Sequence, residues 1–211
     1  MKYEKIRDLC AQQEALLRFE RFDQETAWEL GCRMVAEMKR RELKVCAAVW
    51  SLTGYVLFQY AGEGTTLNNQ NWMKRKFNTV RLMEKSSLAA RAEAEMKDEG
   101  VEKCGLDPRE YVFCGGGFPI RLQTGELVAV ALASGLPDIK DHGFLVDCLA
   151  GHLGVEPPTI DLRKSGPARG HKTFAGPLSF LKYPFKHIDN PTTRLTHAVF
   201  QPNTQRMGRL S

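Results

Sequence analysis

The spacing of apolar residues predicts a long amphipathic helix near the start of the chain. In the segment RFDQETAWELGCRMVAEMKRRE, apolar residues recur every three or four positions, which places them on one face of a helix. These residues are Ala27, Leu30, Met34, Val35 and Met38. Asp23 precedes them at an N-cap position, and basic residues at 39–41 suit the negative end of a helix. Similar patterns predict helices over about 4–17, 68–85, 87–99 and 138–152.

Short apolar runs separated by turn residues predict strands in two parts of the chain. The segment KVCAAVWSLTGYVLFQYA holds two such runs around Ser51–Gly54, which is typical of a β-hairpin. Both faces of its first run are apolar, so we expect that strand to be covered on both sides. Further strands are expected near 111–114, 118–122 and 127–134. Strands joined by short turns favour an antiparallel sheet flanked by helices, so the pattern predicts an α+β fold.

Charge and proline content divide the chain near residue 155. Residues 1–155 hold 21 basic and 22 acidic side chains, a net charge of −1. Residues 156–211 hold 9 basic and 3 acidic side chains, a net charge of +6, and 7 of the 10 prolines. We therefore expect a folded domain over 1–155 and a basic, proline-rich, irregular tail over 156–211. Nucleic-acid binding is not expected of a near-neutral domain, whereas a basic tail can contact a protein partner.

The cysteines and the apolar runs indicate the cellular compartment in which the protein is expected. Six cysteines are scattered without a C-x-x-C pair or a histidine at zinc-site spacing, so neither a disulfide framework nor a metal site is expected. The charged start does not resemble a signal peptide. No run approaches the roughly 20 apolar residues of a membrane helix. These features predict a cytoplasmic protein without a membrane span.

Three consecutive glycines in the segment YVFCGGGFPIRL raise the question of a ligand site. Gly115, Gly116 and Gly117 can adopt positive φ and let the backbone pass close to another surface. Phe118 then begins an alternating strand pattern, and Pro119 removes a donor from the ladder. One interpretation is a bulge or a close strand-to-helix contact. The other is that the bare backbone forms the floor of a pocket.

Two inward-facing polar residues bear on that choice. Lys76 lies four residues from both Trp72 and Val80, on the apolar stripe of its helix. Such a lysine either extends to the edge of the helix or points into a cavity and holds an anion. His142 precedes Leu145 by three residues and also faces inward. Its position in the first turn of a helix disfavours the imidazolium form. It is therefore either a neutral structural histidine or a ligand-contacting one.

These residues define one predicted ligand-binding site at one end of the sheet. Its members are Trp72, Lys76, Gly115, Gly116, Gly117, Phe118 and His142. Backbone N–H groups and Lys76 would favour a carboxylate, and the aromatic side chains would suit a planar acid. The sequence has no G-x-S-x-G elbow, H-E-x-x-H helix or phosphate loop, so no catalytic residue is assigned.

Four blocks of sequence resemble the haem-degrading-domain-like family, which is related to the HbpS and GlcG proteins. They are FDQETAWELG, GTTLNNQNWMKRK, GLDPREYVFCGGGFPIRL and ASGLPDIKDHGFLVDCL, and the likeness covers about residues 14–153. The resemblance implies a profilin- or PAS-like five-stranded antiparallel sheet flanked by helices. It also implies a homo-oligomer larger than a dimer, and it suggests haem as a ligand.

Three classes of function agree with this resemblance. The first, which we favour, is an oligomeric protein that binds haem or another planar anionic molecule. The second is a non-catalytic adaptor, since a fungal relative is linked to the delivery of tail-anchored membrane proteins. The third is an enzyme acting on haem or a small anionic substrate. Haemin binding distinguishes the adaptor from the other two.

Overall fold

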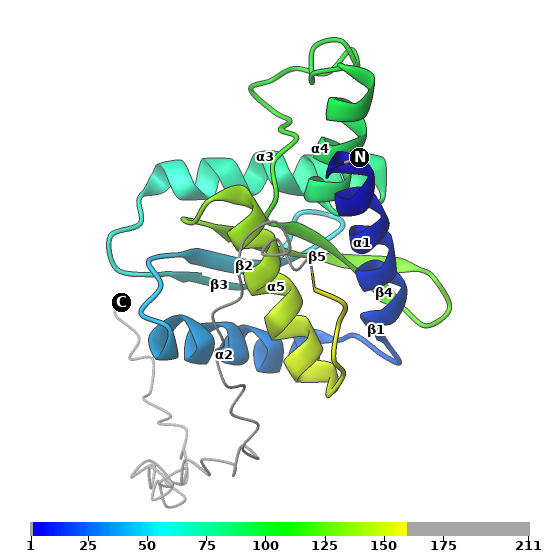
Figure 1. Cartoon of the computed structure of the whole chain (residues 1–211). Helices are drawn as coiled ribbons and strands as arrows, with labels where there is room; N and C mark the ends of the chain where they lie inside the picture. Colours follow the sequence, from blue (N-terminus) through cyan, green and yellow to red (C-terminus); the bar gives the residue numbers. More distant parts are fainter. Residues whose placement is uncertain (1, 160–211) are drawn as a thin grey trace, which may run out of the picture. The chain divides into compact units, whose positions relative to one another are not determined.

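The structure, a computed structural model, describes residues 2–159. In this part the chain forms an α+β fold of five helices and a five-stranded sheet (Figure 1). The helices are α1 (Lys2–Leu16), α2 (Gln24–Arg40), α3 (Leu67–Met83), α4 (Ser87–Lys97) and α5 (Asp138–Leu153). The strands are β1 (Arg18–Phe19), β2 (Cys46–Ser51), β3 (Val56–Ala61), β4 (Gly117–Leu122) and β5 (Leu127–Ser134). The predicted fold class is confirmed, and every predicted helix is present.

The sheet has the strand order β1-β4-β5-β2-β3, with β1 and β3 at its two edges. The pairs β4–β5, β5–β2 and β2–β3 are antiparallel, whereas β1 is parallel to β4. The prediction of a wholly antiparallel sheet is therefore wrong at this edge. Short turns join only antiparallel neighbours, but β1 and β4 are separated by three helices and a hairpin, so their direction is not restricted in that way.

The predicted strand at 111–114 is also wrong, because this segment is irregular. Its backbone bonds to side chains of α3 instead of a neighbouring strand. The Thr79 hydroxyl donates to the Val112 carbonyl at 2.9 Å and accepts from the Val112 amide at 3.1 Å. Asn78 donates to the Glu110 carbonyl at 2.8 Å. These bonds satisfy the backbone without a sheet ladder, and β1 supplies the fifth strand.

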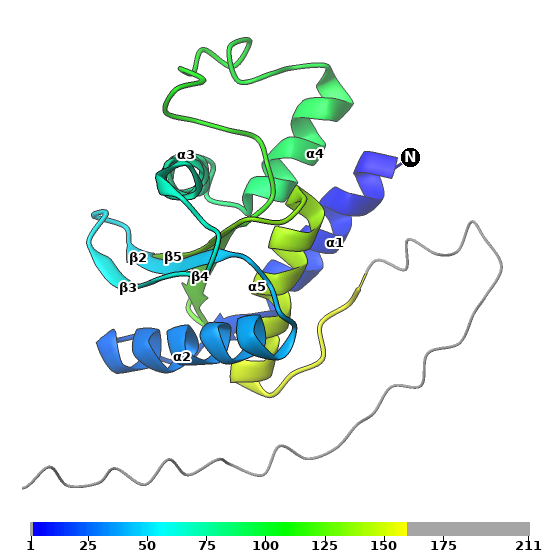
Figure 2. The ribbon, with the colours of Figure 1, turned by 90° about the vertical axis from the view of Figure 1, so that its left-hand side faces the viewer.

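Helices cover both faces of the sheet (Figure 2). α2 and α5 pack on one face and α3 packs on the other. Successive side chains of β2 enter the two cores alternately. Ala47 and Val49 face α2 and α5, whereas Cys46, Ala48 and Trp50 face α3. The prediction that this strand is covered on both sides is confirmed.

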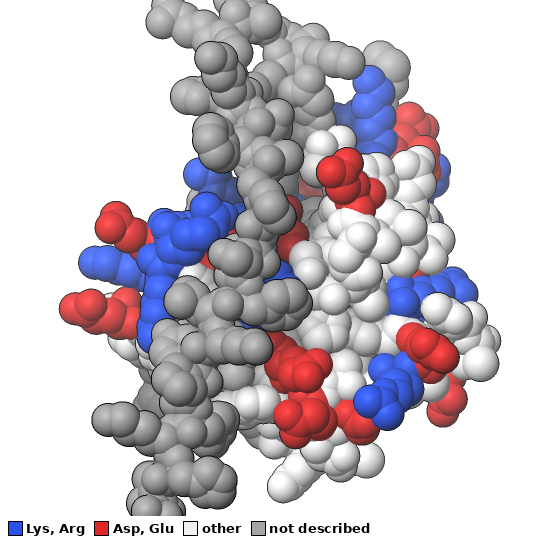
Figure 3. All heavy atoms as spheres, turned by 90° about the horizontal axis from the view of Figure 1, so that it is seen from below, with Lys and Arg blue, Asp and Glu red and all other residues white. Residues whose placement is uncertain are grey.

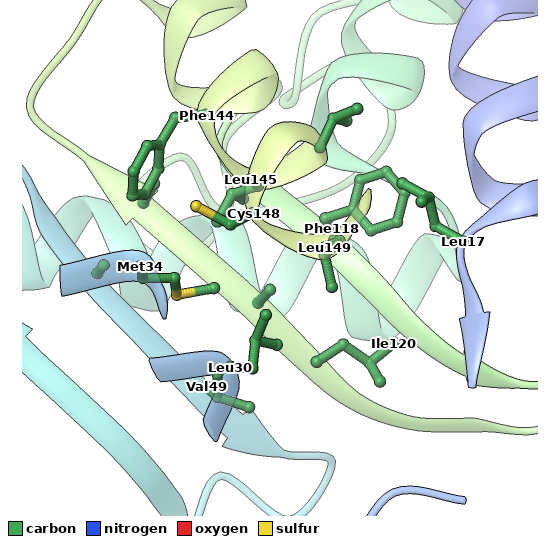
Figure 4. Packing of buried hydrophobic residues seen from close by; sticks show 14 of the residues in the cluster. Leu17, Leu30, Met34, Val49, Phe118, Ile120, Phe144, Leu145, Cys148 and Leu149 are labelled. Atoms are coloured by element: carbon green, nitrogen blue, oxygen red, sulfur yellow. The ribbon is translucent and has the colours of Figure 1, made fainter. Parts of the chain in front are cut away.

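The larger core lies between the sheet and the helices α2 and α5 (Figure 4). Leu30 and Met34 of α2 meet Leu145 and Leu149 of α5 above Ile120 of β4. All five side chains are fully buried. Burying an apolar side chain of this size contributes about 1.5–3 kcal/mol, so this layer holds α5 firmly on the sheet. A smaller cluster joins α1 to α4.

Local signals define the helix ends. The Asp23 carboxylate accepts from the Thr26 amide at 2.9 Å and caps α2, as predicted. Thr66 and Asn69 form a capping box at the start of α3. Pro137 is the N-cap residue of α5. Its missing N–H costs nothing there, because the first amides of a helix have no partner within the helix.

The tail predicted over 156–211 lies, beyond residue 159, outside the described residues, together with any protein contact made through it. α5 ends at Leu153, and Gly154 follows it with φ of 69°. This left-handed conformation is typical of glycine after a helix. No helix within residues 2–159 is long and apolar enough to cross a membrane.

Candidate functional site

A buried ion pair joins α3 to α5. Lys76 and Asp141 each have 2% of the side chain exposed. The Lys76 ammonium donates to Asp141 Oδ2 at 2.9 Å and to the Ala133 carbonyl at 2.8 Å. Asp141 Oδ1 accepts from the Leu136 amide at 2.9 Å. Lys76 therefore does hold an anion, as one sequence interpretation required, but the anion is a carboxylate of the protein itself.

The environment of Asp141 opposes its ionisation. Burial raises the pKa of this carboxyl above its ordinary value, and the Lys76 ammonium and the Leu136 amide act in the opposite direction. Sequence reasoning missed Asp141 as the partner of Lys76. A usable signal was present, because Asp141 precedes Phe144, Leu145 and Cys148 by three, four and seven residues and so faces inward.

The three glycines pack against three different elements. A Cβ on Gly115 would lie 2.3 Å from the Asp138 carbonyl oxygen in α5. On Gly116, whose φ is +110°, it would lie 2.5 Å from the Ala133 carbonyl oxygen and 2.6 Å from Lys76 Nζ. On Gly117 it would lie 2.8 Å from a methyl group of Val80. Side chains are excluded here by protein atoms, which supports the close strand-to-helix contact.

His142 belongs to a second buried polar group beside the glycines. Its Nε2 lies 2.9 Å from Gln13 Oε1 and 3.8 Å from the Cys10 sulfur, both in α1. Its ring centroid is 5.7 Å from that of Phe118. Burial lowers the pKa of His142 to about 4. His142 thus matches the neutral, hydrogen-bonded histidine that was one of the two sequence interpretations, and burial is the cause of its lowered pKa.

We expect His142 to make the fold less stable as the pH falls from about 6.5 to 4. Above this range the imidazole is neutral in both states. Within it the unfolded chain binds a proton that the folded protein resists until about pH 4, so acid favours unfolding. This lowering of the His142 pKa corresponds to a loss of about 3 kcal/mol in the free energy of unfolding once the pH has fallen to about 4.

Urea unfolding of the wild type and of His142→Gln between pH 7 and pH 4 measures this effect. Glutamine keeps an amide donor for Gln13 but does not titrate. The stability of the variant should therefore decline less over this range. Equal declines in the two proteins would contradict the assignment.

The structure brings six of the seven predicted site residues together. Lys76, Gly115–Gly117, Phe118 and His142 form a continuous buried cluster where α3, β4 and the start of α5 meet. Their role in ligand binding stays a prediction. Trp72 is half-buried and stacks with Arg75 instead, with the guanidinium carbon 4.6 Å from the ring.

Two neighbours of this cluster reach the surface and were missed by sequence reasoning. Cys114 is half-buried, and burial raises the pKa of its thiol, while the charges of Lys76, Arg91 and Arg75 lower it in part. Arg75 is half-buried, and its Nε atom is buried and has no hydrogen-bond partner among residues 2–159. An exposed cleft of about 380 Å³ lies between α4 and the segment 98–113, and Arg91, Val112 and Phe113 are among its lining residues.

Comparison with known proteins identifies the family. Residues 22–150 match the family described as haem degrading protein, HbpS-like. A UPF0303 protein of Serratia proteamaculans (strain 568) is 38% identical over 149 residues, which cover 70% of this chain and 92% of the relative. A UPF0303 protein of Azotobacter vinelandii (strain DJ / ATCC BAA-1303) is 38% identical over 154 residues, covering 72% and 92%.

Two solved structures share the fold of this chain. The crystal structure of the Ybr137w protein has a TM-score of 0.64 at 25% identity, covering 72% of this chain and 88% of that one. The crystal structure of HbpS has a TM-score of 0.51 at 21% identity, covering 63% and 90%, and shows a shared fold. The chain therefore belongs to the HbpS-like haem degrading protein family.

Proposed function

We propose that this protein is a homo-oligomeric, cytoplasmic binding protein for a planar anionic molecule, with haem as the candidate ligand. The observation that carries the proposal is the stack of Arg75 on Trp72, with a guanidinium nitrogen that has no hydrogen-bond partner among residues 2–159. A flat aromatic ring next to a cation suits a planar molecule that bears a carboxylate. The family description, which names haem, supports the same class of ligand.

The residues at this surface suit the flat ring of haem and its propionate groups better than they suit its iron. Trp72 and Arg75 can contact the plane and a propionate group. His142 does not fit as an axial ligand, because its Nε2 is bonded to Gln13 and its side chain is buried. Cys114 carries a sulfur donor, but burial raises the pKa of its thiol, which disfavours the thiolate that binds iron. We therefore assign no residue to the iron.

The buried cluster supports binding over acid–base catalysis. A general acid or base must reach the proton of a substrate. The Lys76 ammonium is already bonded to Asp141 and Ala133, and the imidazole of His142 is bonded to Gln13. In this arrangement both side chains act as supports for α3 and α5 behind the Trp72–Arg75 surface.

Titration with haemin and with metal-free protoporphyrin IX, followed by absorbance and by quenching of tryptophan fluorescence, tests the proposal. Arg75→Gln should weaken the binding of both ligands roughly 10- to 150-fold, because a hydrogen bond to a charged group contributes about 1.5–3 kcal/mol. Arg81→Gln is the matched control. It removes the same charge from the same helix, where Arg81 stacks on Phe77 at 5.4 Å. Equal binding by the wild type and both variants would overturn the proposed ligand site.

The oligomeric and cytoplasmic parts of the proposal have separate support. Several large apolar side chains are exposed, among them Trp28, Tyr55 and Leu67, and symmetric assembly is a common way to bury such surface. The six cysteines are all unpaired, as a reducing compartment would leave them. Light scattering should give a multiple of the 23.8 kDa chain mass larger than two. A stable monomer at micromolar concentration would refute the assembly.

A further inference from the structure

One side of α2 has a regular stripe of residues that faces away from the core. Its members are Glu25, Trp28, Cys32, Val35 and Lys39; the sequence pattern placed Val35 on the core-facing stripe, but it is half-buried and lies outside the core cluster. They are spaced by three, four, three and four residues, which is the spacing of a seam between two helices. Trp28 is 57% exposed, and Glu25, Cys32 and Lys39 are also exposed. We call these five residues the α2 seam.

The edge strand β3 lies beside this helix (Figure 2). Among residues 2–159, β3 pairs only with β2, so its other side presents free backbone groups. The strand VLFQYA has no charged residue and no proline, which are the usual means of blocking an edge. Tyr55 before it and Val56 within it are 71% and 45% exposed. This edge is therefore open to another strand.

The seam and the edge strand have their centres at the same level. A Cβ on Gly31 would lie 2.3 Å from the ring of Phe58, so the middle of α2 rests directly on the middle of β3. The Phe58 ring is also 6.0 Å from the ring of Trp28, in an edge-on contact. Cys32, the central residue of the seam, directly follows Gly31. One twofold axis can therefore pass near both centres.

We propose that this face binds a second copy of the chain, with the two α2 helices antiparallel and the two β3 strands side by side. The charged residues of the α2 seam indicate that its partner is a second copy of the chain. Glu25 and Lys39 stand seven residues before and after Cys32. An antiparallel copy therefore places Glu25 opposite Lys39 of the second copy, Lys39 opposite its Glu25, and Cys32 opposite its Cys32.

The ends of the seam are free for this pairing. Neither Glu25 nor Lys39 has an ion-pair partner within residues 2–159. On the side of the molecule where α2 lies, acidic and basic side chains both border uncharged areas of the surface (Figure 3). Opposite charges at equal distances from a central residue are self-complementary, as a twofold interface requires. This inference rests on the assembly part of the proposed function and names the surface that the assembly uses.

Cross-linking of the full-length protein tests the geometry. Cys32 and Cys104 are the exposed thiols and Cys114 is half-buried, whereas the other three cysteines are buried, so a Cys104→Ser/Cys114→Ser protein leaves Cys32 as the accessible thiol. A short bismaleimide should convert this protein to a covalent dimer, because the two Cys32 side chains would face each other across the axis. The protein that also carries Cys32→Ser is the control and should give no dimer.

A charge exchange tests the partner. Glu25→Lys or Lys39→Glu alone should weaken self-association roughly tenfold, because like charges then meet twice at the interface. The double variant restores opposite charges and should recover the wild-type dissociation constant in analytical ultracentrifugation.

The outcomes separate this inference from the proposed function. An oligomer that neither cross-links through Cys32 nor responds to the charge changes would overturn this interface while leaving the assembly intact. A wild-type protein that stays monomeric would overturn both. Cross-linking through Cys32 together with recovery in the double variant would support the interface.

Discussion

Lys76→Met is expected to lower the free energy of unfolding by about 3–5 kcal/mol. The change leaves the Asp141 carboxylate buried without its cation, and the loss reflects that unpaired charge more than lost packing, since methionine fills similar space. Urea denaturation followed by circular dichroism measures it. Lys74→Met is the matched control on the same helix. Its partner Glu110 and Lys74 itself are about half exposed, so that change should cost less than about 1 kcal/mol.

The pH dependence of Lys76→Met gives a second measurement of the same charge. Burial raises the pKa of Asp141, and removal of Lys76 removes an opposing influence. A carboxyl with a raised pKa in the folded state stabilises the fold at low pH and loses that contribution as the pH rises. The variant should therefore be closest to the wild type in acid. A second change, Lys76→Met/Asp141→Asn, keeps an acceptor for Leu136 and should regain part of the loss at neutral pH. A cost no greater than that of Lys74→Met would contradict the importance of the buried pair.

Gly116→Ala is expected to destabilise the fold by about 3–5 kcal/mol, because two costs combine. Its φ of +110° is strained for any residue with a side chain. The new methyl group would also overlap the Ala133 carbonyl oxygen and the Lys76 ammonium. The thermal midpoint and the soluble yield of the variant measure this effect.

Gly143→Ala provides the control for that experiment. Gly143 lies in α5, and a Cβ there would meet no atom within 4 Å. Alanine is the better helix former by about 1 kcal/mol, so this change should leave stability unchanged or raise it. If both alanine variants behaved alike, the close approach at Gly116 would not be what stabilises this junction.

These two experiments test the buried cluster around Lys76 and Gly116. The proposed ligand surface, formed by Trp72 and Arg75, lies outside this cluster. Lys76 points inward from α3 and ties it to α5, while the neighbouring Arg75 stacks on Trp72 at the surface. A variant of Lys76 or Gly116 should therefore change stability first. A variant of Arg75 should change ligand binding with little effect on folding. This difference separates the structural cluster from the proposed site.

Some of the candidate site was readable from the sequence. Helical spacing placed Lys76 and His142 on inward faces, and the three glycines indicated a close approach of the backbone. What each inward residue would meet was not readable, since a pattern gives the direction of a side chain and not its partner. Trp72 illustrates the limit, because it shares the stripe of Lys76 and yet stacks with Arg75 near the surface.

The sequence by itself determined the helices, the hairpin and the two-sided burial of β2, because these depend on residues close together in the chain. Only the tertiary structure decided the parallel pairing of β1 with β4 and the loss of the strand expected at 111–114. It also decided that Lys76 binds Asp141, 65 residues away, and that His142 binds Gln13, 129 residues away. Such partners meet because separate helices pack on one sheet, and burial makes an unpaired polar group there too costly to leave without one.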